Sequence, residues 1–337
     1  MKILVTGGCG FVGINLAEEL LARGESIVLL DRHGLPSGAK TALHQPNPRV
    51  AIVIADVRDP SVLRSAISDF GVQRVIHTAV ITADIQRESR EPNEIIDVNI
   101  RGTVNVLEAA KSTRCDRVIF VSSGAAYGQT HDVGAVLQED ISPSRPDNIY
   151  GMTKFSAEEI GLRLGALWGL KVLCVRLGSV CGPWEFDTGV RDLLSPQLQV
   201  ARLAVRGNVA VIPEHEVRRD WIYSRDVAAG LAAILTAPVP HYSRYHLSSG
   251  LDWSGSFVHW CDSLKSAFPK FSWRIAEKGE KPNVNFLLER DRSPMDIARI
   301  VQDIGFRPRF GPREAYSDYR DWVQEHWDFL INADQSM

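Results

Sequence analysis

The sequence lacks the features of secreted, membrane-spanning and nucleic-acid-binding proteins. Its 337 residues include five cysteines, scattered and without a Cys-x-x-Cys pair, which argues against a disulfide framework, a zinc knuckle or another metal site. Lysine and arginine number 38 against 41 aspartate and glutamate, so no overall basic field indicates nucleic acid or an anionic membrane as a partner. The longest uncharged apolar stretch, near 227–240, is too short to span a bilayer, and the first residues carry no secretory apolar region. We therefore expect a cytoplasmic protein with reduced thiols.

The first half of the chain alternates short apolar runs with longer amphipathic stretches. The runs are rich in β-branched residues and continuous rather than alternating, as in parallel strands that are buried on both faces. They lie at 3–6, 26–30, 50–54, 74–77, 117–121 and 171–175. Helical patterns lie between them at 12–23, 60–70, 92–111 and 150–168. This alternation predicts an α/β fold of the Rossmann type, a doubly wound parallel sheet whose ligand crevice lies at the carboxyl ends of the strands.

The regular alternation stops after residue 178, where tryptophan and proline become frequent. We predict that residues 1–178 form the cofactor-binding domain and that 179–337 form a smaller C-terminal α/β lobe that binds the substrate. The boundary is interleaved, because a segment near 209–248 is expected to return to the main sheet. In that segment we predict a strand at 220–223 and a helix after Asp226.

A glycine-rich loop joins the first predicted strand to the first predicted helix. Gly7, Gly10 and Gly13 have the spacing G-x-x-G-x-x-G, with Phe11 and Val12 opening the helix. Gly7 permits a tight turn, Gly10 lets a pyrophosphate approach the backbone, and Gly13 lets the helix pack close to the strand. The alternative is a glycine-rich connection without a ligand. The strand before the loop and the helix after it favour a dinucleotide site.

Acidic residues at the ends of the next two strands bear on the identity of the dinucleotide. Asp31 follows the second strand, where a carboxylate accepts hydrogen bonds from a ribose diol and repels a 2′-phosphate. This favours NAD over NADP, although the adjacent Arg32 could accommodate a phosphate. Asp56 and Val57 follow the third strand and are placed to meet the adenine. For Asp56 a helix cap, supplied by it or by Asp59, is an equally good interpretation.

Tyr150 and Lys154 lie four residues apart on one face of a predicted helix. A free tyrosine titrates near about 10, and a neighbouring lysine cation stabilises the phenolate and lowers that pKa. Ser122 and Ser123 end the fifth strand, where a hydroxyl can bond the substrate oxygen whose proton the tyrosine takes. The order of glycine loop, serine and Tyr-x-x-x-Lys is more informative than any of these motifs alone.

The chain resembles an extended short-chain dehydrogenase/reductase of the NAD-dependent epimerase/dehydratase family. The residues that carry the resemblance run in family order over about the first 230 positions. They are the stretches 6–13, 56–57, 77–79, 98–103, 121–128, 176–183 and 219–227, with Asp31, Tyr150 and Lys154, and the closing motif 304–308. The resemblance is specific for fold and cofactor and does not identify the substrate.

The resemblance implies a role for each matching residue. Ser123, Tyr150 and Lys154 would be the catalytic residues, with Asn99 supporting the proton relay. The residues that would contact the cofactor are Gly7, Gly10, Phe11, Val12, Gly13, Asp31, Arg32, Asp56, Val57, Thr78, Ala79, Val80, Asn99, Val121, Tyr150 and Lys154. Those that would contact the substrate are Ser123, Gly124, Ala125, Ser179 and Arg219. A homodimer through the helices 92–111 and 150–168 is also implied.

Two of these assignments have structural alternatives. The resemblance also implies that His77 lines the cofactor, but a packed histidine at the end of a strand is the stronger interpretation. Arg219 aligns with the arginine that relatives use on a sugar-nucleotide diphosphate, but a surface ion pair with Asp220 or Asp226 is as good an interpretation.

Departures from the family pattern narrow the chemistry. Dehydratase relatives have Asp-Glu after the catalytic hydroxyl residue, where this chain has Gly124 and Ala125. Relatives that epimerise carbons beside a ketone have a cysteine at the position of Gly124. Cys181 replaces a tyrosine and is expected to be a small packed residue. Ser179 replaces the asparagine that is common in nucleotide-sugar enzymes. The run 176–179, Arg-Leu-Gly-Ser, is similar to that of sugar-acid dehydrogenases of the same superfamily.

Three functions remain open on the sequence. We favour a nucleotide-sugar epimerase of the 4-epimerase type that moves a hydride at a sugar carbinol, on the segment around Arg219. A dehydrogenase of a sugar, sugar acid or polyol is the alternative that Ser179 favours. A catalytically silent NAD-binding module is remote, because Ser123, Tyr150 and Lys154 are all present.

Overall fold

The computed structural model describes residues 1–130, 135–286 and 291–332. Within them the main sheet has seven parallel strands in the order β10-β6-β5-β4-β1-β2-β3. The strands are β1 (Lys2–Thr6), β2 (Ser26–Asp31), β3 (Val50–Ile54), β4 (Arg74–His77), β5 (Arg117–Ser123), β6 (Lys171–Leu177) and β10 (Arg244–Leu247). The order reverses between β1 and β4, which is where a doubly wound sheet opens its ligand crevice. The predicted fold class is confirmed.

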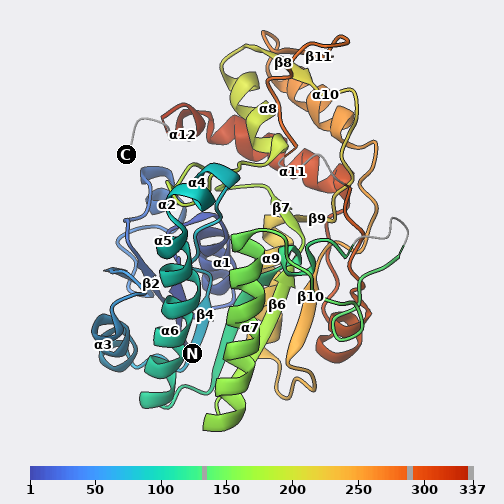
Figure 1. Cartoon of the computed structure of the whole chain (residues 1–337). Coiled ribbons are helices and arrows are strands. Elements are labelled where there is room, and N and C mark those ends of the chain that lie inside the picture. The colour runs from blue at the N-terminus through green and yellow to red at the C-terminus, as the bar shows by residue number, and fades with distance from the viewer. Residues whose placement is uncertain (131–134, 287–290, 333–337) are drawn as a thin grey trace.

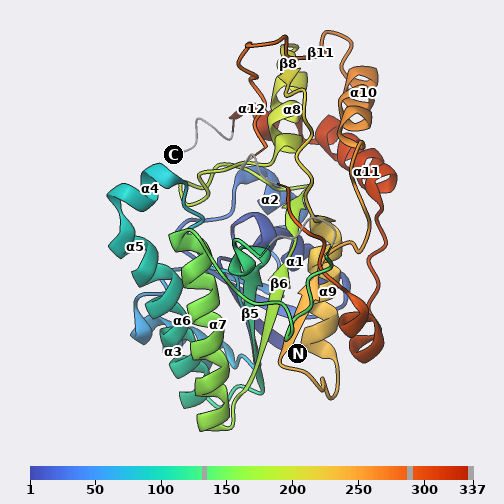
Figure 2. The same ribbon diagram turned by 45° about the vertical axis from the view of Figure 1, so that its right-hand side comes forward.

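Helices cover both faces of this sheet (Figures 1 and 2). Helices α3 (Pro60–Phe70), α6 (Gly102–Ser112) and α7 (Ile149–Trp168) lie together on one face. Helix α1 (Phe11–Ala22) packs against α9 (Ser224–Thr236) on the other. Burial on both faces explains the continuous apolar runs, since β1, β5 and β6 have almost every side chain buried.

The predicted helix 92–111 is present but is less regular than expected. It consists of α5 (Pro92–Ile96), a π-helical turn at Asp97–Arg101 and α6, and α4 (Ile85–Arg90) precedes it. The π-helical turn carries Asn99 and directs it inward, where it is buried.

The outer lobe lies above the carboxyl ends of the strands (Figure 1). Its two strands, β8 (Val209–Ile212) and β11 (Ser272–Ile275), pair in parallel with each other. Its helices are α8 (Pro196–Val205), α10 (Phe257–Ala267), α11 (Pro312–Glu325) and α12 (Trp327–Asn332). The described chain also forms α2 (Ser37–Ala42), a 3-10 turn (Gly124–Tyr127) and a second π-helical turn (Ile300–Ile304), which contacts β10.

One expectation about the returning segment is wrong. The predicted strand 220–223 does not join the main sheet, because β9 (Trp221–Tyr223) pairs with β7 (Ser179–Cys181) in a separate two-stranded sheet. The chain turns out of β6 at Gly178, where a Cβ would come within 2.5 Å of the Asp220 carbonyl oxygen, and β7 runs directly beside β9. The later strand β10 is the one that extends the main sheet. Among the described residues, no helix is long and apolar enough to cross a membrane.

Candidate active site

A pocket of about 1300 Å³ opens where the carboxyl ends of the strands meet the outer lobe. Its lining begins at the loop after β1 and includes the residues that follow β2, β3, β4 and β5. The outer lobe and the segments leading to it complete the lining on the opposite side, with residues such as Phe186, Leu193 and Phe329. The pocket therefore coincides with the crevice expected from the sheet topology.

The glycine loop forms a bare backbone cradle on one side of the pocket. Gly7 has a φ of +67°, and a Cβ there would lie 2.7 Å from the Ala79 nitrogen. A Cβ on Gly13 would lie 2.3 Å from the Gly7 carbonyl oxygen, so only glycine lets α1 pack this close to the loop. Gly10 is the N-cap of α1 and supplies no side-chain cap, which leaves the first N–H groups of the helix for a ligand. Gly7, Gly10, Phe11 and Val12 line the pocket, whereas Gly13 lies behind it.

Replacing Gly10 with alanine is expected to weaken NAD binding without loss of stability. The added Cβ would meet only the Gly7 carbonyl oxygen, at 3.4 Å, so it enters the space above the loop rather than the core. Displacing a pyrophosphate from one or two backbone N–H groups costs about tenfold or more in affinity, because hydrogen bonds to charged groups contribute about 1.5–3 kcal/mol each. Isothermal titration with NAD measures the loss.

Gly161→Ala is the matched control. Gly161 lies inside α7, and the added Cβ would make only ordinary contacts with Leu107 and Val172. Equal NAD affinity in Gly10→Ala and Gly161→Ala would contradict the assignment of the glycine loop.

Acidic residues lie at the expected place for the adenosine end of a dinucleotide. Asp31 accepts hydrogen bonds from the backbone N–H groups of Cys9 (3.1 Å) and His33 (3.2 Å), and burial raises its pKa. These bonds fix the Asp31 carboxylate at the pocket wall. Arg32 lies 3.7 Å from the Glu94 carboxylate, so its charge already has a partner.

Asp56 also lines the pocket, next to Val57. Its carboxylate accepts two bonds from the Arg58 guanidinium, at 3.0 and 2.7 Å. The helix cap is instead Asp59, which accepts from the N–H groups of Ser61 and Val62 at the start of α3. The capping alternative therefore applies to Asp59 and not to Asp56.

The residues at the end of β4 and just after it have two different roles: His77 is structural, and the three residues that follow it line the pocket. His77 is buried, bonded to the hydroxyls of Thr6 (2.6 Å) and Thr103 (3.0 Å), and burial lowers its pKa to about 3. His77 is thus a packed, neutral histidine, as expected from the sequence, and it does not line the pocket. Thr78, Ala79 and Val80 line the pocket.

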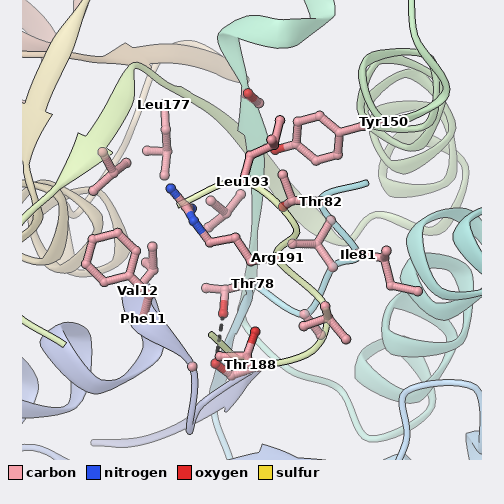
Figure 3. Close-up of a pocket in the computed structure, with 18 of the residues that line it drawn as sticks. Phe11, Val12, Thr78, Ile81, Thr82, Tyr150, Leu177, Thr188, Arg191 and Leu193 are labelled. Carbon is pink, nitrogen blue, oxygen red and sulfur yellow. Dashed lines mark hydrogen bonds between the residues drawn. The ribbon is translucent and has the colours of Figure 1, made fainter. Parts of the chain in front are cut away.

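Ser123, Tyr150 and Lys154 all line the pocket. Ser123 is the last residue of β5, and its hydroxyl accepts from the Ala125 N–H at 3.1 Å. Tyr150 is the second residue of α7 and points into the pocket (Figure 3). The buried Lys154 ammonium, one turn later, donates to the Val121 carbonyl oxygen at 2.7 Å. The arrangement can hold a sugar hydroxyl between a serine and a tyrosine whose phenolate a cation stabilises.

Lys154 is expected to titrate near neutral pH in the NAD-free protein. Burial lowers the pKa of its ammonium to about 7, while the nearby Cys174 and Glu158 act in the opposite direction. The charged form is therefore complete well below pH 7 and falls to about a tenth at pH 8. Carbon NMR of protein labelled at the lysine Cε measures this midpoint, with Lys154→Met to assign the signal. A Lys154 signal that titrates near 10.5, with the surface lysines, would contradict it.

Asn99 supports this site from behind the pocket wall. Its side-chain amide donates to the Ile81 carbonyl oxygen (3.0 Å) and to the Thr153 hydroxyl (2.9 Å), and its oxygen accepts from the Ile81 N–H (2.8 Å). Asn99 is buried and is not among the lining residues. It connects the segment after β4 to α7, which places it as a positioning residue.

The residues expected to contact the substrate all line the pocket. Gly124 and Ala125 follow Ser123 directly in the chain, Ser179 begins β7 beside β9, and Arg219 donates to the outer segment at Phe286. Arg219 is buried and donates to the Phe286 carbonyl oxygen at 3.1 Å, so the surface ion pair expected as its alternative does not describe it.

The acidic neighbours of Arg219 are engaged elsewhere. Asp220 accepts from the Ser248 hydroxyl and the Met295 N–H, and Asp226 accepts from the N–H groups of Arg309 and Phe310. Cys181 is buried, and burial raises its pKa well above the ordinary thiol value, in agreement with a packed residue.

Comparison with known proteins decides the family. The model of the family described as "NAD dependent epimerase/dehydratase family" matches residues 3–247. The chain belongs to this family. It is 30% identical over 334 residues to "Putative UDP-glucose 4-epimerase" of Methanocaldococcus jannaschii. The alignment covers 96% of this chain and 99% of that protein.

Two solved structures are similar to this chain over nearly its whole length. UDP-glucose 4-epimerase of Thermus thermophilus, in complex with NAD, is 26% identical, has a TM-score of 0.75 and covers 96% of this chain and 99% of its own. UDP-glucuronic acid 4-epimerase of Bacillus cereus has the same fold, with a TM-score of 0.78 at 20% identity, covering 96% of this chain and 99% of its own.

The pocket fits the NAD that the family name specifies. The cradle above Gly10, the uncapped start of α1 and the carboxylate of Asp31 are the groups that would hold its pyrophosphate and ribose. Lys154 and Tyr150 would lie at the nicotinamide end.

Sequence reasoning missed a buried network behind the catalytic residues. Glu158 follows Lys154 by one more turn of α7, so Tyr150, Lys154 and Glu158 share a helix face. Its carboxylate accepts from the Ser122 hydroxyl at 2.9 Å and from two nitrogens of Arg176, each at 3.0 Å. The spacing of four residues was a signal that could have identified it.

Proposed function

We propose that the chain is an NAD-dependent epimerase that inverts the carbinol at C4 of a nucleotide sugar. The observation that carries the proposal is that Ser123, Tyr150 and Lys154 all line the pocket, and that the two residues after Ser123 are Gly124 and Ala125. This set can move one hydroxyl proton, and Gly124 and Ala125 provide no further acid or base for eliminating water. The relatives named as 4-epimerases support the same chemistry.

The residues of this chain would divide the reaction between them. Tyr150, as a phenolate that the Lys154 cation stabilises, would take the proton of the C4 hydroxyl and become a neutral phenol, while Ser123 holds the oxygen of that hydroxyl. NAD, when bound, supplies a reversible hydride acceptor. Tyr150 would return the proton after the sugar has presented its other face. The carboxylate of Asp31, at the ribose, favours NAD over NADP.

The outer lobe, residues 179–337, would hold the nucleotide part of the substrate. Arg219 supplies a buried guanidinium in the pocket wall, and such a group bonds a diphosphate in a forked geometry. The chain is further proposed to be a cytoplasmic homodimer. Five buried, unpaired cysteines support the reducing compartment, and exposed Ile96 and Met152, on the helical segments 92–111 and 150–168, support the dimer.

Ser179 favours a second function, a dehydrogenase of a sugar, sugar acid or polyol. Its short side chain lines the pocket close to Gly178. Such an enzyme would release reduced cofactor in each turnover and would need no diphosphate clamp.

Proton NMR of a mixed substrate panel distinguishes the two functions. The protein is incubated with substoichiometric NAD and with UDP-, GDP- and dTDP-sugars, free sugars and sugar acids. Interconversion of C4 stereoisomers beyond the NAD supplied is the result the proposal expects. Oxidation that stops when NAD is consumed and resumes on its addition would establish the dehydrogenase instead.

A further inference from the structure

A segment of the chain bridges the mouth of the pocket. Residues 186–193, which we call the strap, lie between β7 and α8 and contribute much of the lining on that side. The Thr82 N–H donates to the Val190 carbonyl oxygen at 2.8 Å, and the Asp192 N–H donates to the Thr82 carbonyl oxygen at 3.1 Å. The strap is therefore joined by backbone hydrogen bonds to the segment that follows β4, across the pocket.

Side chains reinforce this junction. The Arg87 guanidinium lies 3.2 Å from the Asp192 carboxylate and donates to the Gly189 carbonyl oxygen at 2.8 Å. Asp192 also accepts from the Asp84 N–H at 3.1 Å. A ligand lying along the pocket floor would be enclosed by the strap.

Arg191 is the strap residue that extends into the pocket. Figure 3 shows its side chain reaching across the pocket toward Phe11 and Leu177. Its guanidinium carbon lies 5.4 Å from the centre of the Phe11 ring, and Phe11 is the first residue of α1. The charge of Arg191 is thus held beside the uncapped start of that helix.

The guanidinium is oriented and still has bonding capacity. One terminal nitrogen lies 3.0 Å from the carboxylate of Glu185, which is fully buried and also accepts from the Ser195 N–H at 2.9 Å. The Nε atom is buried and has no hydrogen-bond partner among the described residues. Glu185 therefore fixes one edge of the guanidinium, and the Nε–H is left without a protein partner among the described residues.

We propose that Arg191 closes over the pyrophosphate of the bound dinucleotide and holds it against the start of α1. A planar guanidinium whose Nε–H has no partner among the described residues can donate to the oxygens of a diphosphate, and the free N–H groups at the start of α1 can donate to the same anion. The position beside Phe11 assigns Arg191 to the cofactor, whereas Arg219 lies with Phe286 on the side of the outer lobe. The inference rests on the cofactor of the proposed function and not on its substrate.

This arrangement links cofactor release to opening of the strap. NAD could leave only when Arg191 withdraws and the bonds between the strap and Thr82 break. Slow release suits an enzyme that returns its hydride in every turnover.

Substitution of Arg191 by glutamine tests the proposal by cofactor binding alone. We expect NAD and ADP-ribose to bind about tenfold to a hundredfold more weakly to Arg191→Gln, because a charge-assisted bond to the pyrophosphate is lost. Adenosine, which has no phosphate, is expected to bind as it does to the wild type. Arg191→Lys, which keeps the charge without the fork, is expected to lie between the two. Isothermal titration gives the affinities, and stopped-flow displacement of NADH fluorescence gives the release rate.

Arg101→Gln is the matched control, since it removes the same charge at an exposed site and is expected to leave all three affinities unchanged. Unchanged NAD affinity in Arg191→Gln would overturn the proposal, as would an equal loss for adenosine. Weaker binding of a nucleotide sugar with normal NAD binding would also overturn it, by placing Arg191 at the substrate. Because no turnover is measured, a chain that epimerises none of the sugars tested would still give a decisive result.

Discussion

Replacing Tyr150 with phenylalanine is expected to lower turnover by at least about a hundredfold while leaving NAD affinity nearly intact. A positioned general acid or base contributes about 10²–10⁴-fold to the rate, and Tyr150 is the side chain that would carry the proton. The ring would remain at the start of α7, so the pocket shape and the contacts of Lys154 would persist. Initial rates with an active nucleotide sugar and titration with NAD, on the same preparation, measure both effects.

The control for this variant is Tyr242→Phe. Tyr242 is 47% exposed, lies outside the pocket lining and is expected to tolerate the loss of its hydroxyl. Turnover of Tyr150→Phe at the wild-type rate would contradict the assigned mechanism.

Replacing Glu158 with glutamine is expected to lower the free energy of unfolding by about 3–5 kcal/mol. Glu158 is fully buried, and its carboxylate is the partner of the buried Arg176 and of Arg244. A neutral amide would leave these guanidinium charges without a buried counter-charge. The loss of Glu158 would also remove a group that raises the pKa of Lys154, so the Lys154 titration should move below 7. Denaturant unfolding and the lysine NMR titration measure the two effects.

Glu159→Gln is the matched control for Glu158→Gln. Glu159 is the next residue and also contacts Arg244, but its side chain is 52% exposed. Exposed ion pairs contribute less than about 1 kcal/mol. An equal loss of stability in both variants would show that the buried network has no special role.

The first half of the fold was predictable because each element carries its own local signal. The continuous apolar runs correspond to β1 to β6 within two residues at each end, and the glycine spacing identified the loop before α1. Tyr150 and Lys154 could be found because both lie on one helix, where a spacing of four residues fixes their relation.

The remaining parts depend on contacts between distant segments. The three residues of β9 have the apolar pattern of a strand, but the pattern does not say whether that strand pairs in the main sheet or elsewhere. The pairing with β7 follows from the turn at Gly178, which directs β7 alongside β9. Arg191 has no sequence signal, since its position follows from the hydrogen bonds between the strap and Thr82. Asp328 and Phe329 line the pocket from α12, and Phe329 is placed there by packing against Trp184 and Phe186, which are far from it in the sequence.

The most direct test of the central claim is the fate of the hydrogen on the inverted carbon. The protein is incubated in deuterium oxide with a nucleotide sugar that it epimerises, and the product is examined by proton NMR. We expect no solvent deuterium at C4, because the hydrogen leaves and returns on the enclosed cofactor while Tyr150 moves only the hydroxyl proton. Deuterium incorporated at C4 would show that the carbon is deprotonated by a base, and would contradict the account.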